Sequence, residues 1–222
     1  MSSSNIFFTS DLHFGHKSVL NFCPCFRNFR SVDEMDHRLI ELWNYTVGVN
    51  DEIYNLGDFS FYRDIEKTIS ISKRLNGKHT LILGNHDELI KDHRDELLKM
   101  SKFDGNRLFE DILDYKELAL KFKDDSYRLV LFHYPILEWN AGHHGSILLY
   151  GHVHDSVSPL KGRALNVGYD LHGKILHLRD VISYTKDLPP FEHQADKKFS
   201  TNDTIANREI KIREILRANN ER

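Results

Sequence analysis

The sequence predicts an α/β protein with a parallel sheet, followed by a second sheet that is mixed or antiparallel. Through the first hundred residues, short apolar segments alternate with segments of helical periodicity. The order strand–helix–strand–helix–strand–helix is typical of a parallel sheet. Beyond residue 107, apolar segments follow one another without clear helices between them, which favours a further sheet. The 222 residues, of which 40% are apolar, are enough for one sizeable core.

Three strands and three helices are expected in the first half. Each strand is an apolar segment that runs into a polar turn, and the three span residues 5–9, 52–56 and 79–83. The first helix is expected to begin at Ser31, because Glu34 three residues later completes a capping box. Its apolar residues recur at helical spacing: Val32, Met35, Leu39, Ile40 and Trp43. Two further helices are expected over residues 65–76 and about 88–100.

The sequence of the second half predicts more strands and a distinct C-terminal segment. Residues 108–122 have alternating character, and further strands are expected at 127–132, 147–150 and 164–167. Residues 1–188 are expected to form one domain, with 189–222 as a charged extension that is helical in part. Docking on a partner or on the domain, and a loosely held solvated helix, are equally weighted alternatives for this extension.

Composition narrows the classes of function. The 30 basic and 33 acidic residues give a formal net charge of −3, which does not indicate a nucleic-acid partner, although a local basic patch would be compatible. Cys23 and Cys25 are too few for a disulfide scaffold or a zinc site of their own. No signal peptide or membrane-length apolar run is visible. We therefore expect a cytoplasmic protein without a membrane partner, and the oligomeric state stays open.

Residue types that bind metals follow five of the predicted strands. In chain order they are Asp11 and His13, Asp58, Asn85 and His86, His133, and His152 and His154. Each cluster alone has an ordinary reading, since Gly-Asp and Gly-Asn are common turns and a lone histidine is often structural. In α/β folds, however, the ligand crevice lies outside the carboxyl ends of the strands. The joint pattern therefore predicts that these loops deliver their side chains to one site.

The series Asp-x-His, Gly-Asp, Gly-Asn-His-Asp, His and Gly-His-x-His resembles the calcineurin-like metallophosphoesterase superfamily. These motifs span residues 11–154. Residues 7–59 also resemble small bacterial and phage-encoded members, through Ser-Asp-x-His-Phe-Gly-His and Leu-Gly-Asp-Phe. The resemblance implies a four-layer β-sandwich of two mixed sheets flanked by helices. It also implies hydrolysis of a phosphate ester by direct attack of a metal-bound hydroxide, without a phosphoenzyme.

The resemblance further implies a role for each motif residue. Asp11, His13 and His154 would hold one metal, Asn85, His133 and His152 a second, and Asp58 would bridge the two. This oxygen and imidazole set suits two divalent ions, with manganese favoured over iron, zinc, nickel or magnesium. The absence of cysteine ligands argues against a closed structural zinc site.

Two neighbouring residues are expected to be catalytic rather than ligands. By resemblance, His86 would protonate the leaving oxygen, a role that contributes typically about 10²–10⁴-fold in rate. Asp87 would orient the imidazole of His86 or cap the helix that follows, and the two readings carry equal weight.

The substrate is expected to be a small phosphate ester. Phe59 and Phe61 stand where protein phosphatases of the superfamily carry Asp-Arg-Gly, which argues against a protein substrate and favours a nucleotide-like or other small molecule. A nuclease is the alternative enzyme, and a non-catalytic scaffold is the less favoured alternative from another class.

Several residues outside the motifs receive mainly structural interpretations. His16 is expected to make a structural hydrogen bond, with contact to a phosphate oxygen as the less favoured alternative. Arg27 and Arg30 are expected to lie on a solvated face, with contact to an anionic substrate as the less favoured alternative. A pocket-rim role for His143 and His144 is the minority interpretation. Asn166 and Asp170 are expected, again by resemblance, to support the site from behind.

Overall fold

The computed structural model describes residues 5–191, 202 and 204–220, and the chain divides into two compact units, 1–192 and 193–222. In chain order the elements are β1 (Ile6–Thr9), α1 (Val19–Phe22), α2 (Val32–Thr46), β2 (Glu52–Asn55), α3 (Ile65–Ser72), β3 (Lys78–Ile82), α4 (Glu88–Asp92), α5 (Arg94–Leu97), β4 (Asp111–Leu113), β5 (Lys116–Phe122), β6 (Asp125–Leu131), the 3₁₀ helix η1 (Gly142–His144), β7 (Ile147–Tyr150), β8 (Ala164–Asn166), α6 (Tyr169–His172), β9 (Leu176–His177), α7 (Leu178–Thr185) and α8 (Ile205–Asn220).

The larger unit contains two mixed sheets, which confirms the predicted α/β class. The first sheet has the order β4-β3-β2-β1-β9, in which β1 to β4 are parallel and β9 is antiparallel to β1. The second sheet has the order β5-β6-β7-β8, in which only the β5–β6 hairpin is antiparallel. The sequence therefore predicted both the parallel part and the mixed second sheet.

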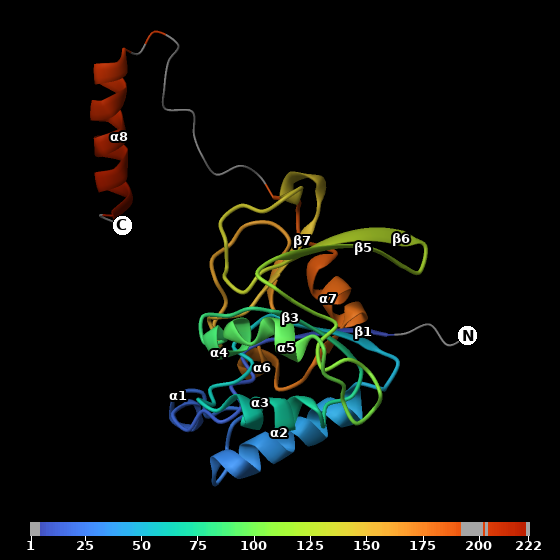
Figure 1. Ribbon diagram of the computed structural model, residues 1–222. Helices are drawn as coiled ribbons and strands as arrows, with labels where there is room; N and C mark the ends of the chain where they lie inside the picture. The colour runs from blue at the N-terminus through green and yellow to red at the C-terminus, as the bar shows by residue number, and fades with distance from the viewer. Residues whose placement is uncertain (1–4, 192–201, 203, 221–222) are drawn as a thin grey trace. The chain divides into compact units, whose positions relative to one another are not determined.

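Alternation along the strands of the first sheet explains how the layers pack. The helices α2 and α3 cover one face of this sheet (Figure 1). Phe7 and Ile53 point to that face and join Met35 and Trp43 in one buried cluster. The next residue of β1, Phe8, points the other way. Its face packs against the second sheet, in a cluster that shares side chains from β1, β2, β3, β6 and β7. Successive side chains of a strand alternate between faces, so both faces of this sheet are apolar and buried.

The first long helix begins as predicted. Ser31 is the N-cap of α2, and its Oγ accepts a hydrogen bond of 3.1 Å from the backbone N–H of Glu34. The reciprocal half of the capping box differs, because the Glu34 carboxylate accepts the N–H of Arg30 at 2.8 Å. The cap therefore extends one residue further back than the sequence pattern predicted.

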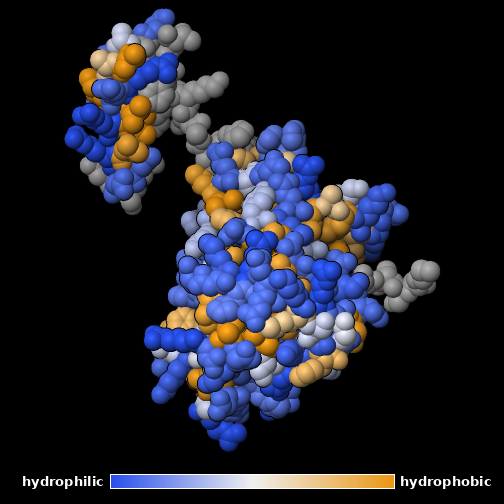
Figure 2. Space-filling model, viewed as in Figure 1, coloured by the Kyte–Doolittle hydropathy of each residue, from blue (hydrophilic) through white to orange (hydrophobic). Residues whose placement is uncertain are grey.

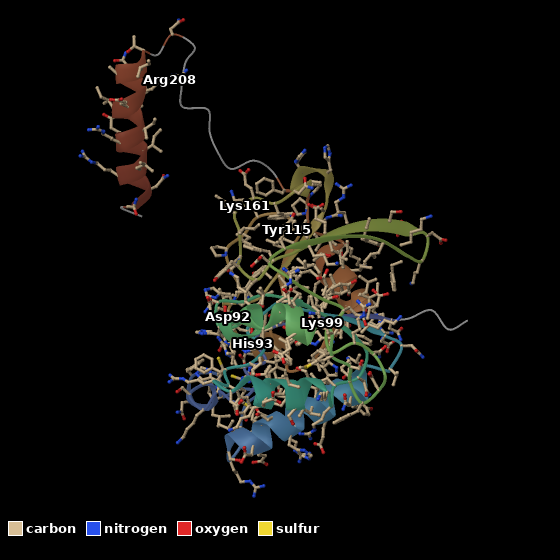
Figure 3. The ribbon with its side chains drawn as sticks, viewed as in Figure 1. Asp92, His93, Lys99, Tyr115, Lys161 and Arg208 are labelled. Carbon is tan, nitrogen blue, oxygen red and sulfur yellow. The ribbon has the colours of Figure 1, made fainter. Side chains whose placement is uncertain are left out.

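The prediction of a single helix over residues 88–100 is wrong. Two short helices, α4 and α5, occupy this segment and are separated at His93, which Figure 3 shows beside Asp92. Nδ1 of His93 lies 2.9 Å from the carbonyl oxygen of Leu89, the acceptor that a continuing helix would give to a backbone N–H. This side chain satisfies the carbonyl and ends the helix. The helix expected to reach residue 76 also ends earlier, at Ser72.

Short elements in the second half were not predicted, among them η1, α6, β9 and α7. The predicted helix of the C-terminal segment is α8, whereas residues 192–201 and 203 lie outside the described residues. Figure 2 shows hydrophobic surface along α8. Ile205, Ile210 and Leu216 of this helix are exposed. Every helix that the structure describes is too short or too polar to cross a bilayer.

Candidate metal centre

The loops that follow β1 and β2, and those that follow β6 and β7, are joined by backbone hydrogen bonds. The N–H of Asp11 donates to Gly57 O at 2.9 Å, and that of His13 donates to Asp58 O at 3.0 Å. In the second sheet, Gly151 N–H donates to His133 O at 2.8 Å. The two sheets meet here, because the N–H of His152 donates to the carboxylate of Asp11 at 3.0 Å. The carboxyl ends of strands from both sheets thus form one site.

Two glycines allow these loops to approach closely. Gly57 has a φ of +96°, a conformation that L side chains rarely adopt, and it directly precedes Asp58. Gly84 precedes Asn85, and a Cβ at this position would overlap the backbone nitrogen and the carboxylate of Asp58. The glycines in the Gly-Asp and Gly-Asn motifs are therefore required by the packing of the β2 and β3 loops.

Many of the candidate ligands have a strained backbone. Positive φ values between 50° and 71° occur at Asp11, His13, Asp58, His152 and His154. Among the described non-glycine residues, only Lys123 and Ala141 share this conformation. Such residues cost about 1–3 kcal/mol each and concentrate at active sites and ligand clamps, where the surrounding structure holds them in place. The strain is thus concentrated on the residues that the motifs single out.

Six of the motif residues form two groups of three. Within each group, the possible ligand atoms lie within 4.8 Å of one another. One group is Asp11, His13 and His154, and the other is Asp58, His133 and His152. The Oδ2 atom of Asp58 lies 3.6 Å from Nε2 of His133 in its own group and 3.6 Å from Nε2 of His13 in the other, so this carboxylate is close to both groups.

Asn85 joins the second group. Its Oδ1 lies 2.9 Å from Nδ1 of His152 and 3.2 Å from Nε2 of His133. An amide oxygen beside two imidazole nitrogens is a suitable donor set for a divalent cation. The structure therefore brings together all seven residues that the sequence predicted as ligands.

The surroundings of the buried histidines favour the neutral imidazole, which is the form that can bind a metal. Burial, together with the neighbouring His154, lowers the pKa of His13 to about 2, and burial also lowers the pKa of His133. Both rings are therefore neutral at physiological pH and can offer a nitrogen lone pair. Both ring nitrogens of His13 are buried and make no hydrogen bond within the described part of the chain. Buried polar atoms without partners are costly, and a cation between the groups would satisfy one of these nitrogens.

Burial also raises the pKa of Asp11 to about 7. Two buried carboxylates, Asp11 and Asp58, repel each other across the site, and this repulsion adds to the shift. A bound cation would relieve the repulsion and stabilise both carboxylates in their charged form. The residues present thus fit the pair of divalent metals that the motifs imply.

Arg27 supports the site from below, which corrects the expectation that it lies on a solvated face. Its side chain is buried, and its Nε donates to Asp170 Oδ1 at 2.5 Å. Its Nη2 donates to Asp11 O at 2.5 Å and its Nη1 to Leu12 O at 2.9 Å. The guanidinium thereby fixes the strained loop after β1. Arg30, by contrast, is exposed, as expected, and it pairs with Glu34.

Asp170 extends this support to a candidate ligand. Its Oδ2 lies 2.7 Å from Nδ1 of His154, which leaves Nε2 of His154 for a metal. A carboxylate on the far nitrogen of a ligating histidine fixes the ring and raises its basicity. Asn166 also lies behind the site, where its Nδ2 donates to His154 O at 2.9 Å. The sequence predicted supporting roles for Asp170 and Asn166 but not for Arg27.

His86 lies beside the metal groups without belonging to either. Its backbone N–H donates to Asp58 Oδ1 at 2.9 Å, and its exposed ring is centred 4.8 Å from that of Phe61 and 5.7 Å from that of His13. The main chain of His86 is thus fixed by the Asp58 carboxylate, while its exposed imidazole is accessible to a substrate.

The role of Asp87 differs from both predicted alternatives. It makes no side-chain cap to α4 and no hydrogen bond to the His86 ring within the described structure. Its buried carboxylate instead accepts the N–H groups of Asp58, Phe59 and Gly84 at 2.8–2.9 Å. Burial raises its pKa to about 7, although these bonds oppose the shift. Asp87 therefore ties the β2 loop to the β3 loop.

Two other features near the site do not add ligands. Cys23, His154 and Asp170 form a third close group, but burial raises the pKa of the Cys23 thiol to about 12 and keeps it protonated. The structural hydrogen bond expected of His16 is not made through Nδ1, which is buried without a partner in the described structure. The His16 ring instead stacks on Phe61, with the centroids 3.8 Å apart.

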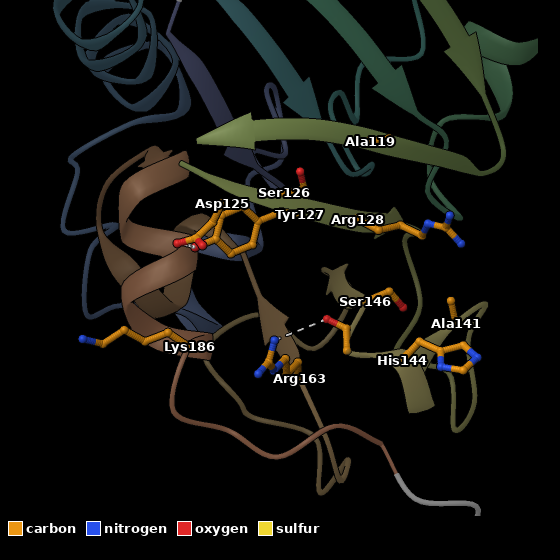
Figure 4. A pocket seen from close by; sticks show the side chains of 11 residues that line it. Ala119, Asp125, Ser126, Tyr127, Arg128, Ala141, His144, Ser146, Arg163 and Lys186 are labelled. Atoms are coloured by element: carbon orange, nitrogen blue, oxygen red, sulfur yellow. Dashed lines mark hydrogen bonds between the residues drawn. The ribbon is translucent and has the colours of Figure 1, made fainter. Parts of the chain in front are cut away.

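A separate cavity of about 670 Å³ lies on the second sheet (Figure 4). It is lined by Arg128, His144 and Lys186, among others, and by Arg163, whose Nη1 donates to Gly145 O at 3.5 Å. None of the candidate metal ligands lines it. His144 therefore borders this cavity, and the minority expectation that it rims the metal site is wrong.

Comparison with known proteins gives relatives whose names state no activity. No protein-family model matches the chain. It is 30% identical to the gene 66 protein of Mycobacterium phage D29 over 205 residues, covering 83% of this chain and 98% of that protein. It is also 30% identical to the gene 66 protein of Mycobacterium phage L5 over 193 residues, covering 78% and 90% of the two chains. The chain therefore belongs to the family of these gene 66 proteins.

Further matches extend to archaea and bacteria. An uncharacterised protein of Methanocaldococcus jannaschii is 32% identical over 130 residues, or 58% of this chain and 65% of that protein. The crystal structure of a protein of unknown function from Aquifex aeolicus superposes with a TM-score of 0.58 at 22% identity. It covers 82% of this chain and 100% of that one, which shows a shared fold.

Proposed function

We propose that this protein is a two-metal phosphoesterase of the calcineurin-like type. The observation that carries the proposal is the pair of adjacent three-residue groups, one of which contains Asp58, built from strained loops of both sheets. The packing of two mixed sheets, with helices on the outer face of the first, is compatible with the four-layer sandwich of that superfamily. The substrate would be a small phosphodiester or phosphomonoester.

The donor set determines what the site can bind. Asp11, His13 and His154 would hold one divalent cation, Asn85, His133 and His152 the other, and Asp58 would contact both. Oxygen and imidazole donors accept manganese, iron, zinc, nickel or magnesium, with manganese our first expectation. Two such ions would neutralise charge on a phosphoryl group and lower the pKa of an attacking water.

His86 is the proposed general acid. Its imidazole lies outside both ligand groups, and the hydrogen bond from its N–H to Asp58 Oδ1 keeps its main chain next to the carboxylate proposed to contact both metals. There it would deliver a proton to the oxygen of the leaving group. Asp87, as the bridge between the two loops, is proposed to position His86 rather than to exchange protons with it.

The test separates metal binding from proton donation. The protein is freed of metal with a chelator, reloaded with manganese, and assayed on alkyl and aryl phosphate esters, with metal content measured for each variant. His86→Ala should keep both metals and lose about 10²-fold or more on alkyl esters, with a smaller loss on activated aryl esters that leave without a proton. Asp58→Ala should lose metal and activity together, and His37→Ala, an exposed control, should behave as wild type.

Two outcomes would contradict the proposal. Full activity of His86→Ala on an alkyl ester would exclude it as the acid. A manganese-loaded protein that hydrolyses no ester in a broad panel would instead support a non-catalytic scaffold.

A further inference from the structure

Two grooves adjoin the candidate metal centre and share Asn85 and Glu88. The first, here called the Phe61 groove, has a volume of about 460 Å³ and includes Phe61, Arg63, His86 and Asp92 in its lining. The second, the Tyr134 groove, has a volume of about 410 Å³ and includes Lys91, Asp114, Phe132 and Tyr134. Pockets of roughly 300–1,000 Å³ hold small organic ligands, so each groove can take one compact group.

Each groove begins at the site itself. Asn85, which lines both, lies 2.9 Å from Nδ1 of His152 through its Oδ1. The Phe61 groove contains the proposed acid, His86. The Tyr134 ring, in the other groove, lies with its centroid 4.8 Å from that of His152. A phosphorus atom at the metal centre would therefore have one groove on the side of the acid and one on the side of His152.

An aromatic ring is held in place in each groove. Phe61 is partly exposed, and it is fixed by the stacked His16 ring at 3.8 Å. Tyr134 is 37% exposed and packs edge-on against His152 and beside Phe132 at 5.7 Å. Exposed aromatic rings beside a polar centre provide stacking surfaces for planar groups such as nucleobases.

The charged residues of the two grooves limit how many phosphate groups a substrate can carry. The exposed charged residues of the Phe61 groove are Arg63, Glu88 and Asp92, the last of which is labelled in Figure 3. Those of the Tyr134 groove are Lys91, Glu88 and Asp114. Each groove thus holds two exposed carboxylates for one exposed cation. Further phosphates along either groove would meet repulsion, whereas polynucleotide binding depends on a surplus of cations.

We propose that the substrate is a phosphodiester with one uncharged, planar, nucleoside-like substituent in each groove, that is, a dinucleoside monophosphate. This inference rests on the proposed phosphoesterase function. A monoester would fill only one groove, and a longer strand would place phosphates among the carboxylates.

The step is a balanced hydrolysis. The oxygen of water forms a new bond to phosphorus, and the ester bond from phosphorus to the leaving oxygen breaks. His86 supplies the proton to that oxygen and regains one from the attacking water, which gives one nucleoside and one nucleoside monophosphate. Because His86 lines the Phe61 groove, the leaving nucleoside occupies that groove, and the nucleoside that keeps the phosphate occupies the Tyr134 groove.

The experiment compares four substrates on the manganese-loaded protein: adenylyl-adenosine, methyl p-nitrophenyl phosphate, adenosine monophosphate and a tetraadenylate. Phe61→Leu and Tyr134→Leu should each raise KM for adenylyl-adenosine by about 5- to 100-fold, the loss expected for one stacked base. With methyl p-nitrophenyl phosphate, whose single ring is the leaving group, Phe61→Leu should raise KM and Tyr134→Leu should not. Phe61→Tyr and Tyr134→Phe should retain the wild-type KM, and Tyr45→Leu, at a residue 93% exposed on α2, is the matched control.

The outcomes distinguish this inference from the function on which it rests. No hydrolysis of any of the four substrates would overturn the proposed function itself. Hydrolysis of methyl p-nitrophenyl phosphate, combined with an unchanged KM for adenylyl-adenosine in folded Phe61→Leu and Tyr134→Leu, would overturn only the two-groove assignment. A tenfold higher kcat/KM on tetraadenylate than on adenylyl-adenosine would overturn it in favour of a nuclease, and a preference for adenosine monophosphate would do so in favour of a monoesterase.

Discussion

The buried pair of Arg27 and Asp170 shows how single residues maintain the candidate centre. Burial alone would raise the pKa of Asp170, but hydrogen bonds from His154 and Arg27 outweigh it and hold this pKa below its ordinary value. The Arg27 side chain is completely enclosed, and three of its contacts reach residues that border or belong to the site. Removal of one member of such a pair leaves an uncompensated buried charge.

Arg27→Met should therefore destabilise the protein by about 3–5 kcal/mol in urea unfolding at pH 7. Because the folded pKa of Asp170 is depressed, its contribution is present above pH 3.8 and is lost as the pH falls below that value. In the variant, this acid-dependent part of the stability should shrink, since Asp170 no longer has its cationic partner. Arg30→Met, which removes an exposed arginine, is the control and should leave the unfolding midpoint unchanged. Equal midpoints for Arg27→Met and wild type would show that the buried pair adds no stability.

At the scale of elements, a helix can be stabilised by its own cap as well as by tertiary packing, or by tertiary packing alone. The helix α2 has a hydrogen-bonded N-cap at Ser31 and buries Met35, Leu39, Ile40 and Trp43 on the first sheet. The four-residue α1 has Ser18 in the N-cap position, without any side-chain cap. Helices this short are held by their surroundings rather than by their own nucleation.

Ser31→Ala should cost about 1 kcal/mol, within the range of 0.5–2 kcal/mol found for lost N-caps. The reason is that the N–H of Glu34 loses its acceptor at the start of α2. Ser18→Ala is a matched control and should be neutral, because Ser18 makes no cap. Urea unfolding of both variants, followed by circular dichroism, measures the difference, and equal losses would argue against the cap as the cause.

For the folded unit of residues 1–192, the candidate centre is where the two sheets are joined. Asp11, Asp58 and Asn85 come from the first sheet, and His133 and His152 from the second. Metals bound to both sets would link the sheets in the native state only. The gain in stability for a ligand of this kind is about 2.7 kcal/mol at one hundred times its Kd.

We therefore expect metal removal to lower Tm. A gain of that size corresponds to a shift of roughly 5–10 °C for a domain of this length. Thermal unfolding of chelated protein, with and without added manganese, measures the shift. His152→Ala should abolish most of the manganese dependence, whereas the control His93→Ala should keep it, because His93 lies outside both ligand groups. A Tm that does not respond to millimolar manganese, zinc or iron would argue against the centre.

The sequence determined the local features of this protein. Apolar segments bounded by polar turns located β1, β2 and β3 of the first sheet, because a buried strand needs side chains that are apolar on both faces. The same segments located the site, since their carboxyl ends lie at one edge of a parallel sheet. Ser31 marked the start of α2, as the cap depends only on residues a few positions apart.

Only the tertiary structure decided which distant residues meet. Arg27 and Asp170 are 143 positions apart, and no periodicity or motif around Arg27 signals that it is buried. Asp87 faces backbone N–H groups of the β2 loop rather than the helix that it precedes or its neighbour His86, because the two loops pack closely at Gly84. The sequence was sufficient to predict which side chains lie around Asp58. Their support depends on loop geometry and burial, which arise only when both sheets are packed together.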